Sequence, residues 1–249
     1  MNRINDGSFI GGEDLRSFLV IGQSNMAGRG DMSEVAPINN FRCYMLRNGR
    51  FIRMSEPLNV DRAIFEGNFR CGIGLAPSFA NEFANEFKTR IGLIPCADGG
   101  TGIADWQPGE ILYDHAVFMA RLAMRSSSFS GFLWHQGESD AAAEMSSREY
   151  KEKLLNFINS IRRELNAENL PFIMGDLSEN LSTEWASPYD VERISCVIRE
   201  VAEELPFCAA ASVRGLTMKS DGVHFDSASL RELGKRYFDA YKVVTKNEY

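Results

Sequence analysis

Four continuous apolar runs along the chain constrain its fold more than any other feature of the sequence. They are FLVIG at 18–22, IGLIPCA at 91–97, GFLWHQ at 131–136 and FIMGD at 172–176. Apolar runs without alternation are typical of strands covered on both faces, as in a parallel sheet. Helical patterns alternate with them, at 76–89, 112–126, 147–166, 189–205 and 227–244. This order predicts a doubly wound, three-layer α/β/α fold around a central, mostly parallel sheet.

The length and composition of the chain are compatible with one domain of this kind. A chain of 249 residues with 44% apolar composition can bury one large core, so we interpret 1–249 as a single domain. The segment 32–74 has weak periodicity and is too long for an ordinary connection. We expect it to be an irregular insertion beside the site, with a short hairpin around Asn48-Gly49.

The charges and cysteines exclude several classes of partner. The formal charge of −7 includes no basic cluster that could follow a phosphate backbone, which argues against nucleic acid. No stretch of about 18 apolar residues is present, so we expect a soluble protein that does not span a membrane. The five cysteines form no CxxC motif and favour reduced thiols over disulfides or a zinc site. The default compartment is the cytoplasm; secretion or a periplasmic location would require an export signal that has been removed.

Small and polar residues follow three of the predicted strands directly. The sequences are GQSN at 22–25, DGGTG at 98–102 and QGESD at 136–140. Parallel strands end at the same edge of a sheet, and ligands bind at that edge in open α/β folds. The three segments are therefore expected to line one site.

A serine in the first of these segments and a histidine near the far end of the chain could form a Ser-His-acid site. Asp221 and His224 are three residues apart, so the carboxylate could reach imidazole Nδ1 and leave Nε2 facing Ser24. The other histidines, His115 and His135, lie inside a predicted helix and at a strand end, so His224 is the best base by elimination. A helix cap explains Ser24 equally well, and a surface turn explains the DxxH pattern equally well.

The two other segments offer donors for a developing negative charge. The glycine-rich loop 96–106 can present backbone N–H groups, but it lacks the lysine of a phosphate-binding loop. The amide of Gln136 can donate to an oxyanion, whereas Glu138 could hold His224 or a neighbouring backbone N–H. Both side chains could instead serve only to connect loops.

Taken together, four blocks in this order resemble the SGNH-type hydrolases. They are GQSN followed by Met26-Ala27-Gly28, GGTG followed by Trp106, HQGESD, and DGVH at 221–224. More narrowly, they are similar to the carbohydrate esterases of the sialate O-acetylesterase and acetylxylan esterase group, family 6-like in type. The resemblance extends from residue 18 to about residue 241 and implies the flavodoxin-like SGNH hydrolase fold.

The resemblance implies a role for each of the matching residues. Ser24 would be the nucleophile and His224 the general base, with Asp221 as the orienting acid; Glu138 would share or replace the work of Asp221. The oxyanion hole would comprise the Ser24 N–H, the Gln136 side chain and a glycine of Gly99-Gly100, of which Gly100 is preferred. No metal and no cofactor would be needed.

The expected activity is that of a serine esterase that removes O-acetyl groups from carbohydrates through an acetyl-enzyme. Substrate contacts are expected at Gln23, Asn25, Arg29 and Trp106, and Trp134 and Trp185 are further candidates for stacking on a sugar. The alternatives are a noncatalytic carbohydrate-binding protein on the same scaffold and an esterase acting on small esters that are not carbohydrates. A metal-dependent N-deacetylase is disfavoured because the chain has only three histidines and no local ligand cluster.

Overall fold

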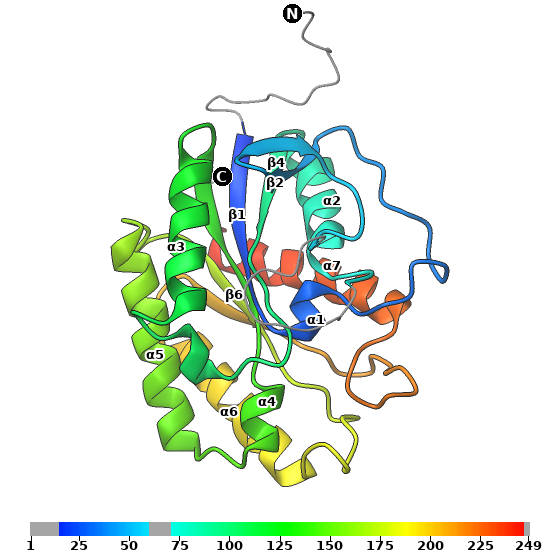
Figure 1. Cartoon of the computed structure of the whole chain (residues 1–249), viewed down its shortest axis with the longest axis vertical. Helices are drawn as coiled ribbons and strands as arrows, with labels where there is room; N and C mark the ends of the chain where they lie inside the picture. Colours follow the sequence, from blue (N-terminus) through cyan, green and yellow to red (C-terminus); the bar gives the residue numbers. More distant parts are fainter. Residues whose placement is uncertain (1–14, 60–70, 247–249) are drawn as a thin grey trace, which may run out of the picture.

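Seven strands form one central sheet in the computed structural model, which describes residues 15–59 and 71–246 (Figure 1). The strand order is β3-β2-β4-β1-β5-β6-β7, and every neighbouring pair is parallel except β2 with β3. The strands are β1 Leu15–Gly22, β2 Cys43–Arg47, β3 Arg50–Arg53, β4 Arg90–Pro95, β5 Ser128–His135, β6 Phe172–Gly175 and β7 Cys208–Ala211. The predicted α/β class with a mostly parallel sheet is therefore confirmed.

Helices cover both faces of the sheet (Figure 1). The long ones are α2 Ala76–Phe87, α3 Ile111–Met124, α5 Ser147–Glu164, α6 Pro188–Glu204 and α7 Ser227–Val244. Three short ones lie in the loops that follow strands: α1 Ser24–Ala27, the 3-10 helix η1 Ile103–Trp106 and α4 Glu138–Ala142. Helices α2 and α7 lie on one face and α3, α5 and α6 on the other, which gives three layers.

The central strand β1 supplies side chains to both apolar cores. Phe18 and Val20 belong to the cluster under α2 and α7, whereas Leu19 and Ile21 belong to the cluster under α3, α5 and α6. Successive side chains of a strand point to opposite faces, so a strand that is buried on both sides must be apolar throughout. Each such side chain contributes about 1.5–3 kcal/mol on burial.

The last helix begins directly after the segment that carries His224. Asp226 is the residue before α7, and its carboxylate accepts a hydrogen bond from Ser229 N at 2.7 Å. Such a cap typically stabilises a helix start by about 1 kcal/mol. It therefore fixes where the loop ends and where α7 starts.

The segment expected to be an irregular insertion contributes two strands, which corrects that expectation in part. The hairpin is confirmed: β2 pairs with β3 through a turn at Asn48-Gly49, and both turn residues have positive φ, 49° and 78°. β2 also pairs with β4 and extends the sheet. Residues 60–70 of the predicted insertion lie outside the described residues.

The sequence patterns also missed β7 and the short helices η1 and α4. β7 reads CAAA and has none of the β-branched residues that usually indicate a strand. The short helices have four or five residues, too few to show a helical period. Within the described part of the chain, no helix is both long enough and apolar enough to cross a membrane.

Candidate active site

The candidate site lies where β1, β4 and β5 end. Gly22 is paired with His135 across β1 and β5, and Gln23 N donates to His135 O at 2.8 Å. Gly22 has a φ of +125°, and a Cβ at this position would overlap the carbonyl oxygen of His135. Only glycine permits so close an approach of two strands at this backbone angle. The chain then turns into α1, whose first residue is Ser24.

Ser24, His224 and Asp221 form one hydrogen-bonded row. The Ser24 Oγ atom lies 3.0 Å from His224 Nε2, and His224 Nδ1 lies 3.0 Å from Asp221 Oδ2. Ser24 is buried, whereas the side chains of His224 and Asp221 are 22% and 40% exposed, so solvent exposure increases from the serine to the acid. This geometry is that of a nucleophile, a base and an orienting acid.

Asp221 is ionised at neutral pH. Burial raises its pKa, but hydrogen bonds from the His224 ring and from the backbone N–H groups of His224 and Val223 outweigh burial and lower the pKa to about 2. A carboxylate that accepts from Nδ1–H fixes the tautomer and leaves Nε2 free to take the serine proton.

The turn that carries Asp221 is anchored on both sides. Lys219 N donates to His224 O at 2.7 Å, and Lys219 Nζ donates to Arg29 O at 2.8 Å. Ser182 N, in the loop after β6, donates to Gly222 O at 2.7 Å. Two other chain segments, at Arg29 and at Ser182, therefore hold the histidine loop at the edge of the sheet, and the Lys219 N–H closes the loop internally.

Gly99 lies beside the serine, and Gly100 does not. A Cβ on Gly99 would lie 3.4 Å from Ser24 Cβ and would overlap the guanidinium of Arg29. A Cβ on Gly100 would meet nothing within 4 Å. Of the two glycines, the structure therefore places Gly99, and not the preferred Gly100, beside the serine.

The Gln136 amide is held below the site, which corrects its expected place in the oxyanion hole. The side chain is fully buried, and Nε2 donates to Asp140 Oδ2 and, at 3.1 Å, to Thr101 O. Tyr150 Oη donates to Gln136 Oε1 at 3.3 Å. Burial raises the pKa of Asp140 to about 6, although hydrogen bonds from Gln136 and Ile103 N act in the opposite direction. No helical spacing indicated this pair, because Gln136 precedes α4 and only Asp140 lies in that helix.

Glu138 contacts Asn25 and His135, whereas the acid beside His224 is Asp221. Glu138 is 1% exposed, and its Oε1 accepts from Asn25 Nδ2 at 2.7 Å and lies 3.5 Å from His135 Nε2. Burial raises the pKa of Glu138, but hydrogen bonds from His135 and Asn25 lower it below its ordinary value overall. Glu138 thus contacts Asn25 and His135, and not His224 as expected.

Three of the four residues expected to contact substrate are buried beneath the site. Gln23 and Asn25 are each 1% exposed, and Trp106 is 0% exposed. Trp106 packs edge-on against Trp134, with ring centroids 5.3 Å apart, and its Nε1 donates to Thr101 Oγ1. Expected substrate contacts at these three residues are corrected, because none presents a surface to a ligand.

Arg29 and Trp185 remain candidates for contacts outside the reacting atoms. Arg29 is half-buried beside Gly99, and its Nη1 donates to Gly28 O at 2.9 Å. Trp185 is 44% exposed and lies in the loop whose Ser182 binds Gly222. Within 15–59 and 71–246, no group of three His, Cys, Asp or Glu side chains is placed to hold a metal ion.

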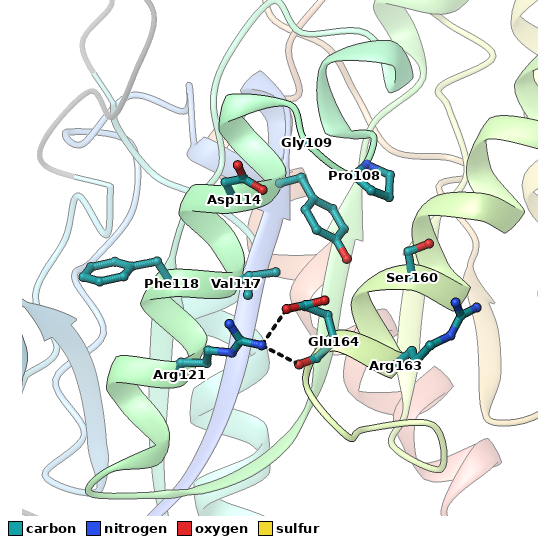
Figure 2. A pocket seen from close by; sticks show the side chains of 10 residues that line it. Pro108, Gly109, Asp114, Val117, Phe118, Arg121, Ser160, Arg163 and Glu164 are labelled. Carbon is teal, nitrogen blue, oxygen red and sulfur yellow. Dashed lines mark hydrogen bonds and ion pairs between the residues drawn. The ribbon is translucent and has the colours of Figure 1, made fainter.

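A cavity of about 520 Å³ lies away from this row of residues, between α3 and α5 (Figure 2). Arg121 of α3 reaches across it to Glu164, with 2.5 Å between Nη2 and Oε1. Tyr113, Val117 and Ser160 also line it, and no residue of the Ser24 row does. The hydrogen-bonded row of Ser24, His224 and Asp221, and not the size of this cavity, therefore locates the candidate active site.

Comparison with known proteins identifies the family. The model of the carbohydrate esterase, sialic acid-specific acetylesterase family matches residues 14–243. The chain belongs to this family. A relative in this carbohydrate esterase group, a probable carbohydrate esterase of Arabidopsis thaliana, is 30% identical over 244 residues, which cover 90% of this chain and 89% of the relative.

Solved structures agree with this membership. The X-ray structure of the Arabidopsis thaliana protein has a TM-score of 0.80 at 28% identity and covers 92% of this chain and 98% of its own. A carbohydrate acetylesterase from Xanthomonas citri has a TM-score of 0.64 at 18% identity, over 92% of this chain and 56% of its own. A lipase/acylhydrolase from Enterococcus faecalis has a TM-score of 0.55 at 14% identity, over 92% and 95%. The last two show the shared hydrolase fold, and the family as a whole indicates an esterase.

Proposed function

We propose that this carbohydrate esterase is a serine esterase that removes O-acetyl groups from carbohydrates through an acetyl-enzyme. The observation that supports this most directly is the row Ser24 Oγ, His224 Nε2, His224 Nδ1 and Asp221 Oδ2, in which each contact is 3.0 Å. Two residues that are 200 positions apart in the sequence meet at hydrogen-bonding distance. Membership of the carbohydrate esterase family supports an acetylated sugar as the substrate class.

In the first half of the reaction, His224 takes the Ser24 proton as Oγ attacks the acetyl carbonyl carbon. The C–O bond to the sugar breaks, and the sugar oxygen leaves with the proton that His224 returns. In the second half, His224 takes a proton from water as the water oxygen attacks the acetyl-Ser24 carbonyl carbon. The bond from that carbon to Ser24 Oγ then breaks, His224 returns the proton to Oγ, and acetic acid leaves and ionises to acetate. Asp221 stabilises the imidazolium form of His224 in both halves.

The carbonyl oxygen becomes negatively charged in each tetrahedral intermediate and requires donors. The Ser24 N–H stands at the start of α1, where backbone N–H groups have no partner within the helix. The Gly99 backbone lies beside the same residue, because a Cβ on Gly99 would lie 3.4 Å from Ser24 Cβ. We assign the oxyanion hole to these two groups, and loss of one such donor typically costs on the order of 10²–10³ in turnover.

Acetate release decides between this function and its alternatives. The enzyme is incubated with acetylated xylan, O-acetylated sialic acids and a chromogenic acetate, with Ser24→Ala as the negative control. Release from one of the carbohydrates that is lost in Ser24→Ala supports the proposal. Release from the chromogenic ester alone would favour an esterase of small esters.

Covalent labelling tests the nucleophile independently of substrate identity. An organophosphonate should modify Ser24 with one equivalent and abolish hydrolysis, whereas a noncatalytic carbohydrate binder would not react. Unchanged hydrolysis in Ser24→Ala would overturn the serine mechanism. Activity that a chelator removes and zinc restores would indicate a metal-dependent deacetylase instead.

A further inference from the structure

Besides Ser24, a second side chain joins α1 to the loop that carries His224. Asn25 follows Ser24 in α1 and is 1% exposed. Its Oδ1 accepts from Phe225 N at 3.1 Å, and its Nδ2 donates to Val223 O at 3.3 Å. Val223 and Phe225 flank His224, so the Asn25 amide binds the backbone on both sides of the candidate base.

Glu138 fixes the orientation of that amide. Its Oε1 accepts from Asn25 Nδ2 at 2.7 Å, a shorter contact than the one to Val223 O. Asn25 Nδ2 has two hydrogens, and both now have an acceptor; Oδ1 has a donor in Phe225 N. The carboxylate therefore keeps Nδ2 toward the two acceptors and Oδ1 toward Phe225. A rotated amide would leave buried groups without partners.

Glu138 is itself held by the end of the sheet. It is the first residue of α4 and lies 3.5 Å from His135 Nε2 at the end of β5. His135 Nδ1 lies 2.9 Å from Tyr237 Oη, and Tyr237 Oη donates to Trp134 O at 2.7 Å. The low pKa of Glu138 keeps its acceptor charged. The contacts thus run from the end of β5, through Glu138 and Asn25, to the histidine loop.

We propose that Asn25 and Glu138 are positioning residues, and that Glu138 acts on His224 only through Asn25 and the backbone of 223–225. This inference rests on the proposed function, because it assumes that His224 serves Ser24. It replaces the substrate contact expected of Asn25, and it gives Glu138 a role different from that of Asp221. Reacting groups displaced by about 1 Å can lose on the order of 10²-fold in rate.

The test compares Asn25→Ala, Glu138→Ala and Glu138→Gln with a matched control, Glu56→Gln. Glu56 is also a buried carboxylate, paired with Arg231 at 2.5 Å, and it contacts no residue of the active row. Hydrolysis of a chromogenic acetate is measured as kcat per serine that an organophosphonate can label, together with KM, the pH profile and the melting temperature.

Positioning predicts that Asn25→Ala and Glu138→Ala lower kcat per labelled serine by about 10- to 100-fold while KM changes less than about threefold. Glu138→Gln should recover most of the loss, because its amide oxygen can still accept from Asn25. The acidic limb of kcat/KM should stay where it is in the wild type. Glu56→Gln should lower the melting temperature and leave kcat per labelled serine unchanged.

Asn25→Asp gives a second test that preserves the shape of the side chain. The new carboxylate can still accept from Phe225 N but faces Val223 O and Glu138 without a proton to donate. As the pH falls, the new carboxyl gains a proton and can donate again, so activity relative to wild type should rise. A purely structural defect would show no such pH-dependent recovery.

Wild-type kcat in Asn25→Ala would overturn the proposal, as would a loss explained wholly by fewer labelled serines. A shift of the acidic limb in Glu138→Ala that matched Asp221→Asn would make Glu138 an orienting acid and would also overturn it. Ser24→Ala, assayed alongside, distinguishes a failure of the serine mechanism from a failure of the positioning role. If that variant stays active, the serine mechanism fails; if it is inactive while Asn25→Ala is normal, only the positioning role fails.

Discussion

Asp221 holds His224 by the backbone as well as by the ring. Its Oδ1 accepts from His224 N and from Val223 N, each at 2.9 Å, while Oδ2 lies 3.0 Å from His224 Nδ1. One carboxylate therefore shapes the DGVH turn and orients the imidazole that it carries. This explains why a spacing of three residues is sufficient: the turn closes on the carboxylate, and no helix is needed.

Replacing Asp221 with Asn should abolish most turnover. The amide can still accept from the backbone through one oxygen, but its NH₂ group would face Nδ1 and favour the wrong tautomer. We expect kcat for a chromogenic acetate to fall on the order of 10³–10⁴-fold with little change in KM. Steady-state kinetics on folded enzyme measures this, and a loss below tenfold would contradict the role of Asp221.

The carboxyl group of Asp140 should make the protein less stable as the pH rises. Its pKa is raised from 3.8 to about 6 in the folded protein, so folding favours the protonated form. Its contribution is full below pH 3.8 and is lost as the pH rises through about 6. The whole effect is worth on the order of 3 kcal/mol.

Asp140→Asn should remove this dependence. The difference in unfolding free energy between variant and wild type is expected to shift in favour of the variant between pH 4 and pH 7. Urea unfolding at several pH values measures that difference. A constant difference across the range would show that Asp140 titrates normally.

Substitution of Gly99 should lower activity, whereas substitution of the neighbouring Gly100 should lower stability. Gly99→Ala places a methyl group 3.4 Å from Ser24 Cβ and against Arg29, so we expect a loss of activity of at least about tenfold. Gly100→Ala meets no atom within 4 Å, but the φ of +79° costs about 1 kcal/mol of stability. Kinetics and thermal unfolding of both variants test this, and the reverse order of effects would restore Gly100 as the oxyanion donor.

Substitutions of Trp106 and Trp185 should distinguish a packing role from a sugar-binding role. Trp106→Phe should destabilise the fold by about 1–3 kcal/mol without raising KM for an acetylated sugar, because Trp106 is buried against Trp134. Trp185→Ala should leave the hydrolysis of a small aryl acetate intact and raise KM for the carbohydrate by about fivefold. An unchanged KM for the sugar in Trp185→Ala would exclude stacking there.

The elements that the sequence predicted best are those with strong local patterns. β1, β4, β5 and β6 lie within the apolar runs or extend from them, and the five long helices begin and end close to the predicted residues. β7 and η1 were missed because four residues without a distinctive composition carry no periodic signal. The Asn48-Gly49 hairpin was found because its turn needs residues that tolerate positive φ.

The candidate site also has features that the sequence predicted and features that it could not predict. The sequence by itself determined the residue types and their order along the chain: a serine after the first strand, a glycine loop after β4, Gln136 and Glu138 after β5, and DGVH before α7. It could not determine which side chains meet, because hydrogen-bond partners depend on distances between segments up to 200 residues apart. Only the tertiary structure placed Gln136 on Asp140, Glu138 on Asn25 and Gly99 beside Ser24. The physical reason is that each buried polar group must find a partner nearby in space, and packing, not sequence position, decides which groups are near.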